Sequence, residues 1–371
     1  MSESKVLLEL VQEHLDQFCD ERRADFSTIS PDLTPVVDYT KDLLQGGKRF
    51  RALFCYWSWA GALSTSDTPQ TEAQRKASAE AMVGITASLE MFHAAALVHD
   101  DLLDQSDTRR GAPAVHKRFE TLHKTSGWAG SPERFGVAGS VLVGDLMLGW
   151  SSEIFGNALL HAPSPAIETA CRTEFSKMRV EVMAGQYLDV LEENAATTRP
   201  IDEAVGRANR VMLFKTAKYT IEAPLLIGAA FAGAEPGLLR SLSAFAIPLG
   251  MAFQLRDDIL GVFGDPAVTG KPAGDDLREG KRTVLVGLTR EALTPSIGKI
   301  FDELLYSREL EAEQIAFLQQ TITESGALAK AERMMEEFAD ESLNALELLD
   351  IEPRAKDQLR ALALKVINRE A

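Results

Sequence analysis

The chain has 371 residues, 45% of them hydrophobic, which is enough to fill the core of one large domain. Its formal net charge of -16 argues against a nucleic-acid-binding protein, which needs a clustered excess of Lys and Arg. The three cysteines are few and far apart, so we expect neither a disulfide framework nor a cysteine-based zinc site.

The sequence also disfavours a secreted protein and a membrane-spanning protein. The N-terminus lacks the basic start and apolar run of a secretory signal, and no stretch reaches about 18 uninterrupted apolar residues. We therefore expect a cytoplasmic protein with no stable membrane insertion.

Apolar residues recur at helical spacing over most of the length, which predicts an all-α fold in one domain over residues 1–371. A doubly wound α/β sheet is the alternative, and its nearest strand candidate is the run VLVGDLML. Breaks between helices are expected near residues 61–70, 120–137, 195–201, 264–281 and 350–354.

The first basic cluster is the turn Gly46-Gly47-Lys48-Arg49-Phe50-Arg51, or GGKRFR. The glycines let the backbone approach a ligand closely, while Lys48 and Arg51 supply a point charge and a planar fork for phosphate oxygens. A solvated basic turn would have the same sequence, so this motif counts only together with others.

A long helix is expected over about residues 72–104, because Thr71 and Gln74 resemble a capping box. It is apolar on nearly every side, which is typical of a buried central helix. Ser164 and Pro165 predict the start of another helix in the same way.

Three aspartates end the central helix. Asp100 and Asp104 share a helical face, and Asp101 lies about 100° round the axis. Carboxylates this close repel each other unless a cation lies between them, and oxygen ligands favour magnesium shared with phosphate. Arg109 and Arg110 follow after one to two helical turns and are expected to reach the same region, although a solvated acidic helix end remains an alternative.

A second acidic pair, Asp257 and Asp258, again ends an apolar helix. If the two helices face each other, their carboxylates can hold several magnesium ions around one diphosphate. Further candidate phosphate contacts are Lys215, Thr216, Lys271 and Lys281.

Together these motifs resemble the trans-isoprenyl diphosphate synthases of the polyprenyl synthetase family, most of all geranylgeranyl diphosphate synthase. The match runs in order over about residues 40–285, where DDLLDQSDTRRG looks like the family's first aspartate-rich motif and FQLRDDILGVFGD like its second. The resemblance implies an antiparallel helical bundle around a deep central cavity, the isoprenoid synthase fold, completed by C-terminal helices over 286–371. It also implies a homodimer and magnesium (Mg2+), about three ions per active site.

The resemblance also assigns roles. The isopentenyl diphosphate site would consist of Lys48, Arg51, His93 and Arg110. The metal ligands would be Asp100, Asp101, Asp104, Asp257 and Asp258. The remaining residues of the allylic side, where catalysis occurs, would be Arg109, Gln186, Lys215, Thr216, Gln254, Lys271 and Lys281.

The second motif departs from the family pattern, because Gly261 replaces its third aspartate. Metal binding is still expected, since diphosphate and water can complete the magnesium shell. Asp265 is a further candidate ligand, although its place just before Pro266 favours a loop cap.

The implied reaction is ionisation, condensation and elimination, with dimethylallyl, geranyl or farnesyl diphosphate as the allylic substrate. The resemblance implies that the residues just before the first motif form the wall that stops the growing chain. Ala95 and Ala96 would leave this wall open, and Met91 and Phe92 would form its floor about 12 to 13 Å from Asp100. The expected product is C20 geranylgeranyl diphosphate, with longer polyprenyl or farnesyl diphosphate as alternatives.

Three other functions remain open. A terpene cyclase would not need GGKRFR or the second aspartate pair, and an HD-type phosphohydrolase would chelate metal through His99 and Asp100. A non-catalytic subunit of a heteromeric prenyltransferase would have lost the aspartates or the basic site, and both are present here.

Overall fold

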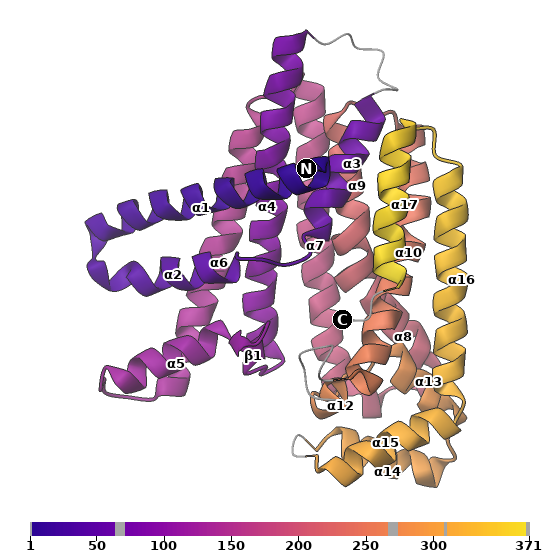
Figure 1. Cartoon of the computed structure of the whole chain (residues 1–371). Helices are drawn as coiled ribbons and strands as arrows, with labels where there is room; N and C mark the ends of the chain where they lie inside the picture. The colour runs from indigo at the N-terminus through magenta and orange to yellow at the C-terminus, as the bar shows by residue number, and fades with distance from the viewer. Residues whose placement is uncertain (1, 64–70, 266–273, 308–309, 369–371) are drawn as a thin grey trace. The chain divides into compact units, whose positions relative to one another are not determined.

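The computed structural model describes residues 2–63, 71–265, 274–307 and 310–368, and Figure 1 traces the chain through them. Helices make up almost all of this part, and its one sheet is a two-stranded hairpin. The prediction of an all-α fold is confirmed, and the VLVGDLML run lies inside a helix.

The described residues divide into two compact units, the first formed by residues 2–56 and 71–169 and the second by the remainder. Two helices, α3 and α7, contribute to both units. The single domain with a central cavity stays a prediction.

The first unit contains two long central helices and the elements around them. Its elements are α1 (Glu3–Ile29), the 3₁₀ turn η1 (Pro31–Leu33), α2 (Thr34–Leu43), the start of α3 (Phe50–Leu63), α4 (Glu72–Leu103), β1 (Thr108–Arg109), β2 (Ala112–Pro113), α5 (Val115–Thr125), α6 (Pro132–Leu159) and the first turn of α7 (Pro165–Ala195).

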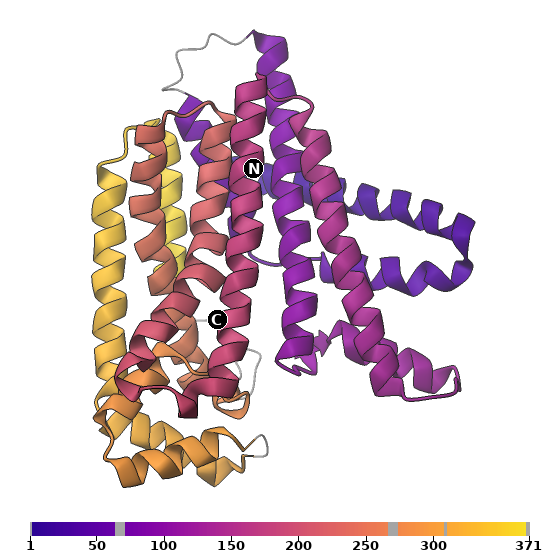
Figure 2. The same ribbon diagram turned by 180° about the vertical axis from the view of Figure 1, so that it is seen from behind.

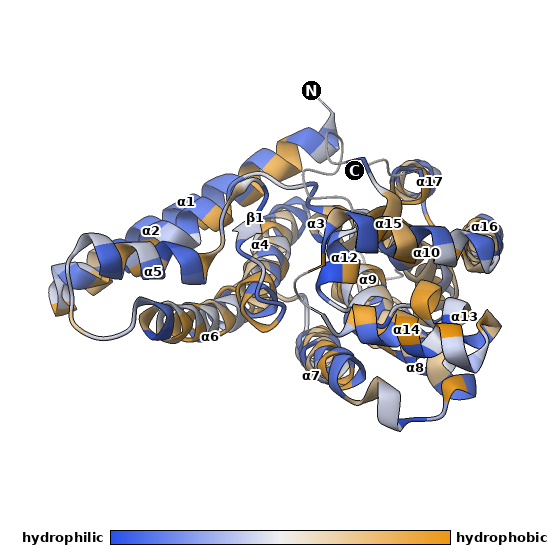
Figure 3. Cartoon of the chain, turned by 90° about the horizontal axis from the view of Figure 1, so that it is seen from below, coloured by the Kyte–Doolittle hydropathy of each residue, from blue (hydrophilic) through white to orange (hydrophobic). Residues whose placement is uncertain are grey.

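Helix α4 is the predicted central helix. Thr71 accepts from the backbone N–H of Gln74, and the Gln74 side chain accepts from the backbone of Thr71, so the expected capping box is present. Nearly every residue between Ala81 and Phe92 is buried. By contrast, α1 is amphipathic, with hydrophobic patches along a largely hydrophilic ribbon (Figure 3).

Helices α4 and α6 run side by side in both views (Figures 1 and 2). Small residues permit this close approach: a Cβ on Gly84 would lie 2.9 Å from Cβ of Ala158, and one on Gly144 would overlap the ring of His99. Packing at this distance fixes the helix that carries the first aspartate motif.

The second unit has a core of its own, built around α10. Its elements are the end of α3, the rest of α7, the 3₁₀ turns η2 (Ala196–Thr198) and η3 (Ile201–Glu203), α8 (Ala204–Val211), the π-helix η4 (Met212–Glu222), α9 (Ala223–Phe231), α10 (Pro236–Phe263), α12 (Asp275–Arg278), α13 (Val284–Ala292), α14 (Pro295–Leu305), α15 (Ala312–Glu324), α16 (Ala327–Glu347) and α17 (Pro353–Ile367).

The π-helix η4 was not expected from the sequence. Two glycines on its neighbours accommodate its wide turn: a Cβ on Gly185 of α7 would lie 2.4 Å from the backbone N of Lys215, and one on Gly250 of α10 would lie 2.4 Å from Cα of Ala217. No real side chain tolerates such contacts, so both positions require glycine.

The breaks expected near residues 195–201 and 350–354 agree with helices that end at Ala195 and begin at Pro353, whereas residues 64–70 and 266–273 of two other expected breaks lie outside the described residues. Ser164 caps α7, whose first residue is Pro165, and the hydrogen bond from the N–H of Ile167 to its hydroxyl measures 3.3 Å. The break predicted over 120–137 is narrower than expected, because α5 continues to Thr125 and α6 begins at Pro132.

Three described helices, α4, α6 and α10, are long and apolar enough to cross a membrane, judged by length and composition alone. In α4, 78% of the apolar window is buried inside the protein, so a core role accounts for its composition. In α6 the buried share is only 39%, which leaves apolar residues of this helix exposed.

Candidate active site

The GGKRFR turn joins α2 to α3. Gly46 and Gly47 have φ of 71° and 88°, which residues with a Cβ rarely adopt. Arg49 is buried, and its guanidinium donates to the carbonyl oxygen of Leu44 at 2.7 Å. Arg49 therefore holds the turn together, while Lys48 is exposed at its tip.

Arg110 meets this turn within the first unit. Its Nη1 donates to the carbonyl oxygen of Gln45 at 3.2 Å, and a Cβ on Gly47 would lie 2.9 Å from its Nη2. The glycine thus leaves room for the guanidinium. The two basic motifs that the sequence placed at one phosphate site lie together.

His93, on α4, lies among the same cations. Burial lowers its pKa well below the usual range, and the charges of Arg51, Arg110 and Arg109 lower it further. Around neutral pH the ring is therefore uncharged beside guanidinium groups. Residues predicted to hold isopentenyl diphosphate thus form one cluster in the first unit.

The first aspartate motif ends α4 as predicted, with Asp104 donating its backbone N–H to Asp100 at 2.8 Å. Asp101 is 2% exposed. Arg109 reaches these aspartates, but not along a helix: α4 stops at Leu103, and the β1–β2 hairpin returns the chain. Its Nε donates to Oδ1 of Asp101 at 2.8 Å and its Nη2 lies 3.4 Å from Oδ2 of Asp100.

The helical spacing that the sequence analysis used to bring Arg109 and Arg110 to the same region was wrong, because a hairpin follows α4. Arg110 and Gly111 have φ of 54° and 76°, the pattern of a type I′ turn, which matches the twist of a two-stranded hairpin. The turn separates the two side chains, so that Arg109 pairs with the aspartates and Arg110 with the GGKRFR turn.

His99 and Asp100 have different partners. The ring of His99 packs on Gly144 of α6, and its Nε2 lies 3.7 Å from Oδ1 of Asp145, whereas Asp100 pairs with Arg109. An HD-type phosphohydrolase needs this histidine and aspartate to chelate one metal, so the arrangement disfavours that reading.

The second aspartate motif lies near the end of α10, in the second unit. Thr216 of η4 donates its hydroxyl proton to Oε1 of Gln254 at 2.6 Å, and Nε2 of Gln254 donates to Oδ1 of Asp258 at 2.8 Å. Asp258 is 4% exposed, and burial raises its pKa well above the usual range. A bound cation would offset that cost.

Lys215 and Gln186 extend this cluster from η4 and α7. Nζ of Lys215 donates to Oδ2 of Asp189 at 2.5 Å. Nε2 of Gln186 is buried and has no hydrogen-bond partner in the described part of the chain. A buried amide donor without a partner carries an energetic cost that a ligand oxygen would remove.

Asp276 of α12 is a candidate site residue that the sequence interpretation did not name. Its Oδ2 occupies the space beside Gly261, where a Cβ would lie only 2.0 Å away. Its charge raises the pKa of Asp258, and Nζ of Lys281 lies 3.8 Å from its Oδ1. Gly261 thus makes room for a carboxylate from another helix. Asp265 is exposed, and Lys271 lies outside the described residues.

Both acidic clusters present carboxylate oxygens, which suit a hard cation such as magnesium. Within the described residues, no three His, Cys, Asp or Glu side chains are arranged to hold a metal ion by themselves. Magnesium usually keeps waters and takes part of its shell from substrate phosphates.

The residues proposed to limit product length lie on α4 of the first unit. Met91, Phe92 and Ala95 are fully or almost fully buried, whereas Ala96 is partly exposed. The small side chains at 95 and 96 lie between the larger ones at 91 and 92 and the first aspartate motif, as the sequence indicates.

Comparisons with known proteins bear on the whole arrangement. The family model "Polyprenyl synthetase" matches residues 33–322. A geranylfarnesyl diphosphate synthase of Aeropyrum pernix is 32% identical over 71% of this chain and 72% of its own. A geranylgeranyl diphosphate synthase of Sulfolobus acidocaldarius is 31% identical over 78% of this chain and 77% of its own.

Among solved structures, a geranylgeranyl pyrophosphate synthase of Corynebacterium glutamicum, complexed with isoprenyl diphosphate and magnesium, is 37% identical, with a TM-score of 0.88 over 98% of both chains. The family match covers both aspartate motifs and the GGKRFR turn. This chain therefore belongs to the polyprenyl synthetase family of trans-prenyl diphosphate synthases.

Proposed function

We propose that the chain is a magnesium-dependent geranylgeranyl diphosphate synthase, which condenses isopentenyl diphosphate with dimethylallyl, geranyl and farnesyl diphosphate. The observation that carries this is the basic cluster of Arg51, His93 and Arg110 next to an aspartate motif that Arg109 pairs with. A second diphosphate-binding site of this kind serves a co-substrate, which a terpene cyclase lacks.

The residues divide the reaction between them. Lys48, Arg51 and Arg110 would bind isopentenyl diphosphate through charge-assisted hydrogen bonds, with uncharged His93 as a further partner. Arg109, Lys215 and Lys271 would bind the allylic diphosphate and favour its departure as an anion.

The allylic cation that remains must be stabilised by nearby electron-rich groups that do not form a covalent bond with it. The Thr216 hydroxyl donates a hydrogen bond to Oε1 of Gln254, so the lone pairs of Thr216 Oγ1 would remain available to stabilise the cation. The double bond of isopentenyl diphosphate then forms the new carbon–carbon bond, and the departed diphosphate takes the proton that is lost. Dry surroundings protect the cation from water.

Magnesium held by Asp100, Asp101, Asp104, Asp257 and Asp258 would neutralise the diphosphate as it leaves. Asp276, beside Asp258, is a further candidate for this set. The family and the magnesium named in the Corynebacterium glutamicum complex support this choice of ion, with about three ions proposed per site.

The C20 product rests on the small residues before the first motif. Similar proteins carry the names geranylfarnesyl, geranylgeranyl and farnesyl diphosphate synthase, so family membership leaves the chain length open. Longer polyprenyl and farnesyl products remain the alternatives.

The test is incubation of the purified protein with isopentenyl diphosphate and each allylic primer, followed by sizing of the dephosphorylated products. We expect a C20 product with magnesium and none with excess EDTA, with activity returning when magnesium is added back. Asp257→Asn should lower turnover by roughly a hundredfold or more, since a metal ligand is lost. Turnover that persists in EDTA would refute the magnesium requirement.

The second candidate is a non-catalytic subunit of a heteromeric prenyltransferase. A heptaprenyl diphosphate synthase component 2 of Geobacillus stearothermophilus, whose name marks it as one part of a larger enzyme, is 28% identical over 91% of this chain. The presence of both aspartate motifs and the basic cluster favours an active enzyme instead. Activity of the chain by itself separates the two.

We propose that the enzyme is a cytoplasmic homodimer that does not insert into membranes. The support for the dimer is α6, which exposes Val137, Val141 and Leu142. Exposed apolar residues clustered on one helix are typical of an interaction surface.

A further inference from the structure

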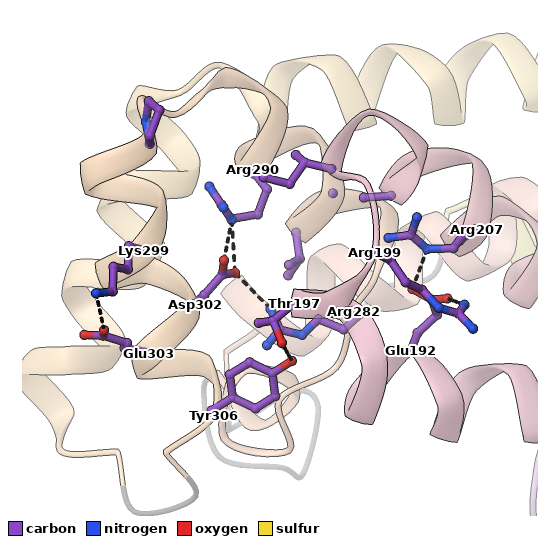
Figure 4. Close-up of a pocket in the computed structure, with 16 residues that line it drawn as sticks. Glu192, Thr197, Arg199, Arg207, Arg282, Arg290, Lys299, Asp302, Glu303 and Tyr306 are labelled. Carbon is purple, nitrogen blue, oxygen red and sulfur yellow. Dashed lines mark hydrogen bonds and ion pairs between the residues drawn. The ribbon is translucent and has the colours of Figure 1, made fainter.

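A cavity of about 480 Å3 lies in the second unit, apart from every residue assigned above to substrate or metal. It is bordered by the end of α7, by η2, η3 and α8, and by α13 and α14 (Figure 4). Part of its wall is apolar, formed by Ala196, Ile201, Val286 and Pro295. Its size is that of a small-molecule site.

The charged residues of its lining are mostly basic. Five basic side chains face three acidic ones, an excess of two positive charges in a chain whose formal net charge is -16. The basic ones are Arg199, Arg207, Arg282, Arg290 and Lys299, and the acidic ones are Glu192, Asp302 and Glu303. Such a concentration of positive charge in an acidic protein attracts anions.

Asp302 serves two arginines. Nε of Arg290 donates to both of its oxygens at 3.0 Å, and Nη1 of Arg282 donates to Oδ1 at 3.2 Å (Figure 4). One carboxylate charge therefore compensates only part of the charge of two guanidinium groups. At the other end of the cavity, Glu192 is shared in the same way by Arg199 and Arg207, at 2.6 and 2.8 Å.

Arg282 is the group that most needs another partner. Its side chain is 7% exposed and its guanidinium carbon lies 4.5 Å from the centre of the Tyr306 ring. Its Nε and Nη2 are buried and have no hydrogen-bond partner among the described residues. Buried donors of a charged group that are left unpaired are costly, and an anion in the cavity would pair with them.

Arg290 is also held ready. A Cβ on Gly298 would lie 1.7 Å from Nη1 of Arg290, so only glycine at position 298 leaves room for the guanidinium group of Arg290. The hydrogen bonds that Arg290 makes within the described residues all come from Nε, which leaves its Nη groups for an acceptor. Guanidinium groups bind phosphate oxygens in pairs.

We propose that this cavity binds a small molecule carrying a phosphate or diphosphate group, which Arg282 and Arg290 hold while the apolar wall contacts the rest of the ligand. Inorganic diphosphate and an organic phosphate share this chemistry. The apolar wall predicts that a phosphate ester with a hydrocarbon or aromatic body binds more tightly than the inorganic ion.

The experiment is calorimetric titration of the full chain, at constant ionic strength and in EDTA, with inorganic diphosphate in one arm and phenyl phosphate in the other. EDTA suppresses binding that depends on metal. Arg282→Gln with Arg290→Gln should weaken binding by roughly tenfold or more, because charged donors are lost. Arg360→Gln is the matched control: this arginine also pairs with two carboxylates, Glu347 and Asp357, but lies outside the cavity, and binding should be unchanged.

Because replacement of the buried Arg282 can disturb folding, a second variant changes an exposed residue of the cavity lining instead. Thr197 is exposed and lines the cavity, and Thr197→Glu adds a negative charge without removing a buried group. It should also weaken binding by roughly tenfold. The proposal would be overturned if the unmodified chain does not bind, if both cavity variants bind as tightly as the unmodified chain, or if binding is lost instead in Lys48→Gln.

Discussion

Ala95 is fully buried on α4, a little more than one turn before Asp100. If its small side chain leaves the product cavity open, Ala95→Phe should shorten the main product from C20 to C15 or less, because the ring occupies the path of the growing chain. Product sizing measures this. Ala95→Gly is the matched control and should leave the profile unchanged; an unchanged profile in Ala95→Phe would contradict the assignment of the wall.

His93 predicts a pH dependence of stability. Burial and neighbouring arginines lower its pKa in the folded state below the ordinary value of about 6.5. The unfolded chain therefore binds the proton more readily, so this residue lowers the unfolding free energy as pH falls below about 6.5. Between pH 7.5 and 5.5, the original chain should lose more stability than His93→Gln.

Urea denaturation of both proteins at each pH measures the effect, and the comparison cancels the contributions of other titrating groups. Parallel losses in the two proteins would show that His93 is not held uncharged. Burial of His93 is the largest cause of the lowered pKa, and the charges of Arg51, Arg110 and Arg109 add to it, so the difference should shrink only weakly in high salt.

For individual residues, the sequence predicted which residue types come together in the candidate site, but it did not predict all of their contacts. GGKRFR and the two aspartate motifs are readable because their spacing puts the side chains on one turn or one helical face. Asp276 was missed because it fills the space beside Gly261 from another helix, a contact that spacing along the chain does not encode.

At the scale of elements, the π-helix η4 leads to a prediction about stability. Gly250→Ala would place a Cβ 2.4 Å from the backbone of Ala217, and overpacking against backbone should destabilise the fold by about 1–3 kcal/mol. Gly237→Ala lies on the same helix, α10, with no atom within 4 Å of the added Cβ. This control should be neutral or stabilise by up to about 1 kcal/mol, since alanine favours a helix.

Chemical denaturation of the two variants measures both effects. Equal stability would mean that η4 relaxes to an ordinary α-helix at little cost. If η4 positions Lys215 and Thr216, Gly250→Ala should also lower turnover, whereas Gly237→Ala should not.

Helix starts were predictable because caps are local: Thr71 with Gln74, and Ser164 with Pro165, specify them within four residues. The π-helix was not, because its apolar pattern barely differs from that of an α-helix. The β1–β2 hairpin was missed although Gly111 and Pro113 are turn signals that favour it over a continued helix.

For the whole molecule, composition and helical periodicity predicted the all-α class, since both are summed over hundreds of residues. They do not predict assembly, which depends on what each surface exposes. Helix α6 is the element where this matters, because its apolar window is only 39% buried within the chain.

If α6 forms the interface of a homodimer, a charge placed there should separate the subunits. Leu142 is 63% exposed, and Leu142→Lys would bury an unpaired charge in the interface while leaving the core of the monomer intact. Sedimentation analysis should show a dimer for the original chain and a monomer, or at least a roughly tenfold weaker dimer, for the variant.

Leu348→Lys provides the matched control, because Leu348 is even more exposed, at 85%, but lies outside α6. That variant should remain dimeric. If both variants stay dimeric, the interface lies elsewhere, and if the original chain is already a monomer, the exposed face of α6 has another role. A monomeric Leu142→Lys that still converts the allylic primers would further show that each subunit carries a complete active site.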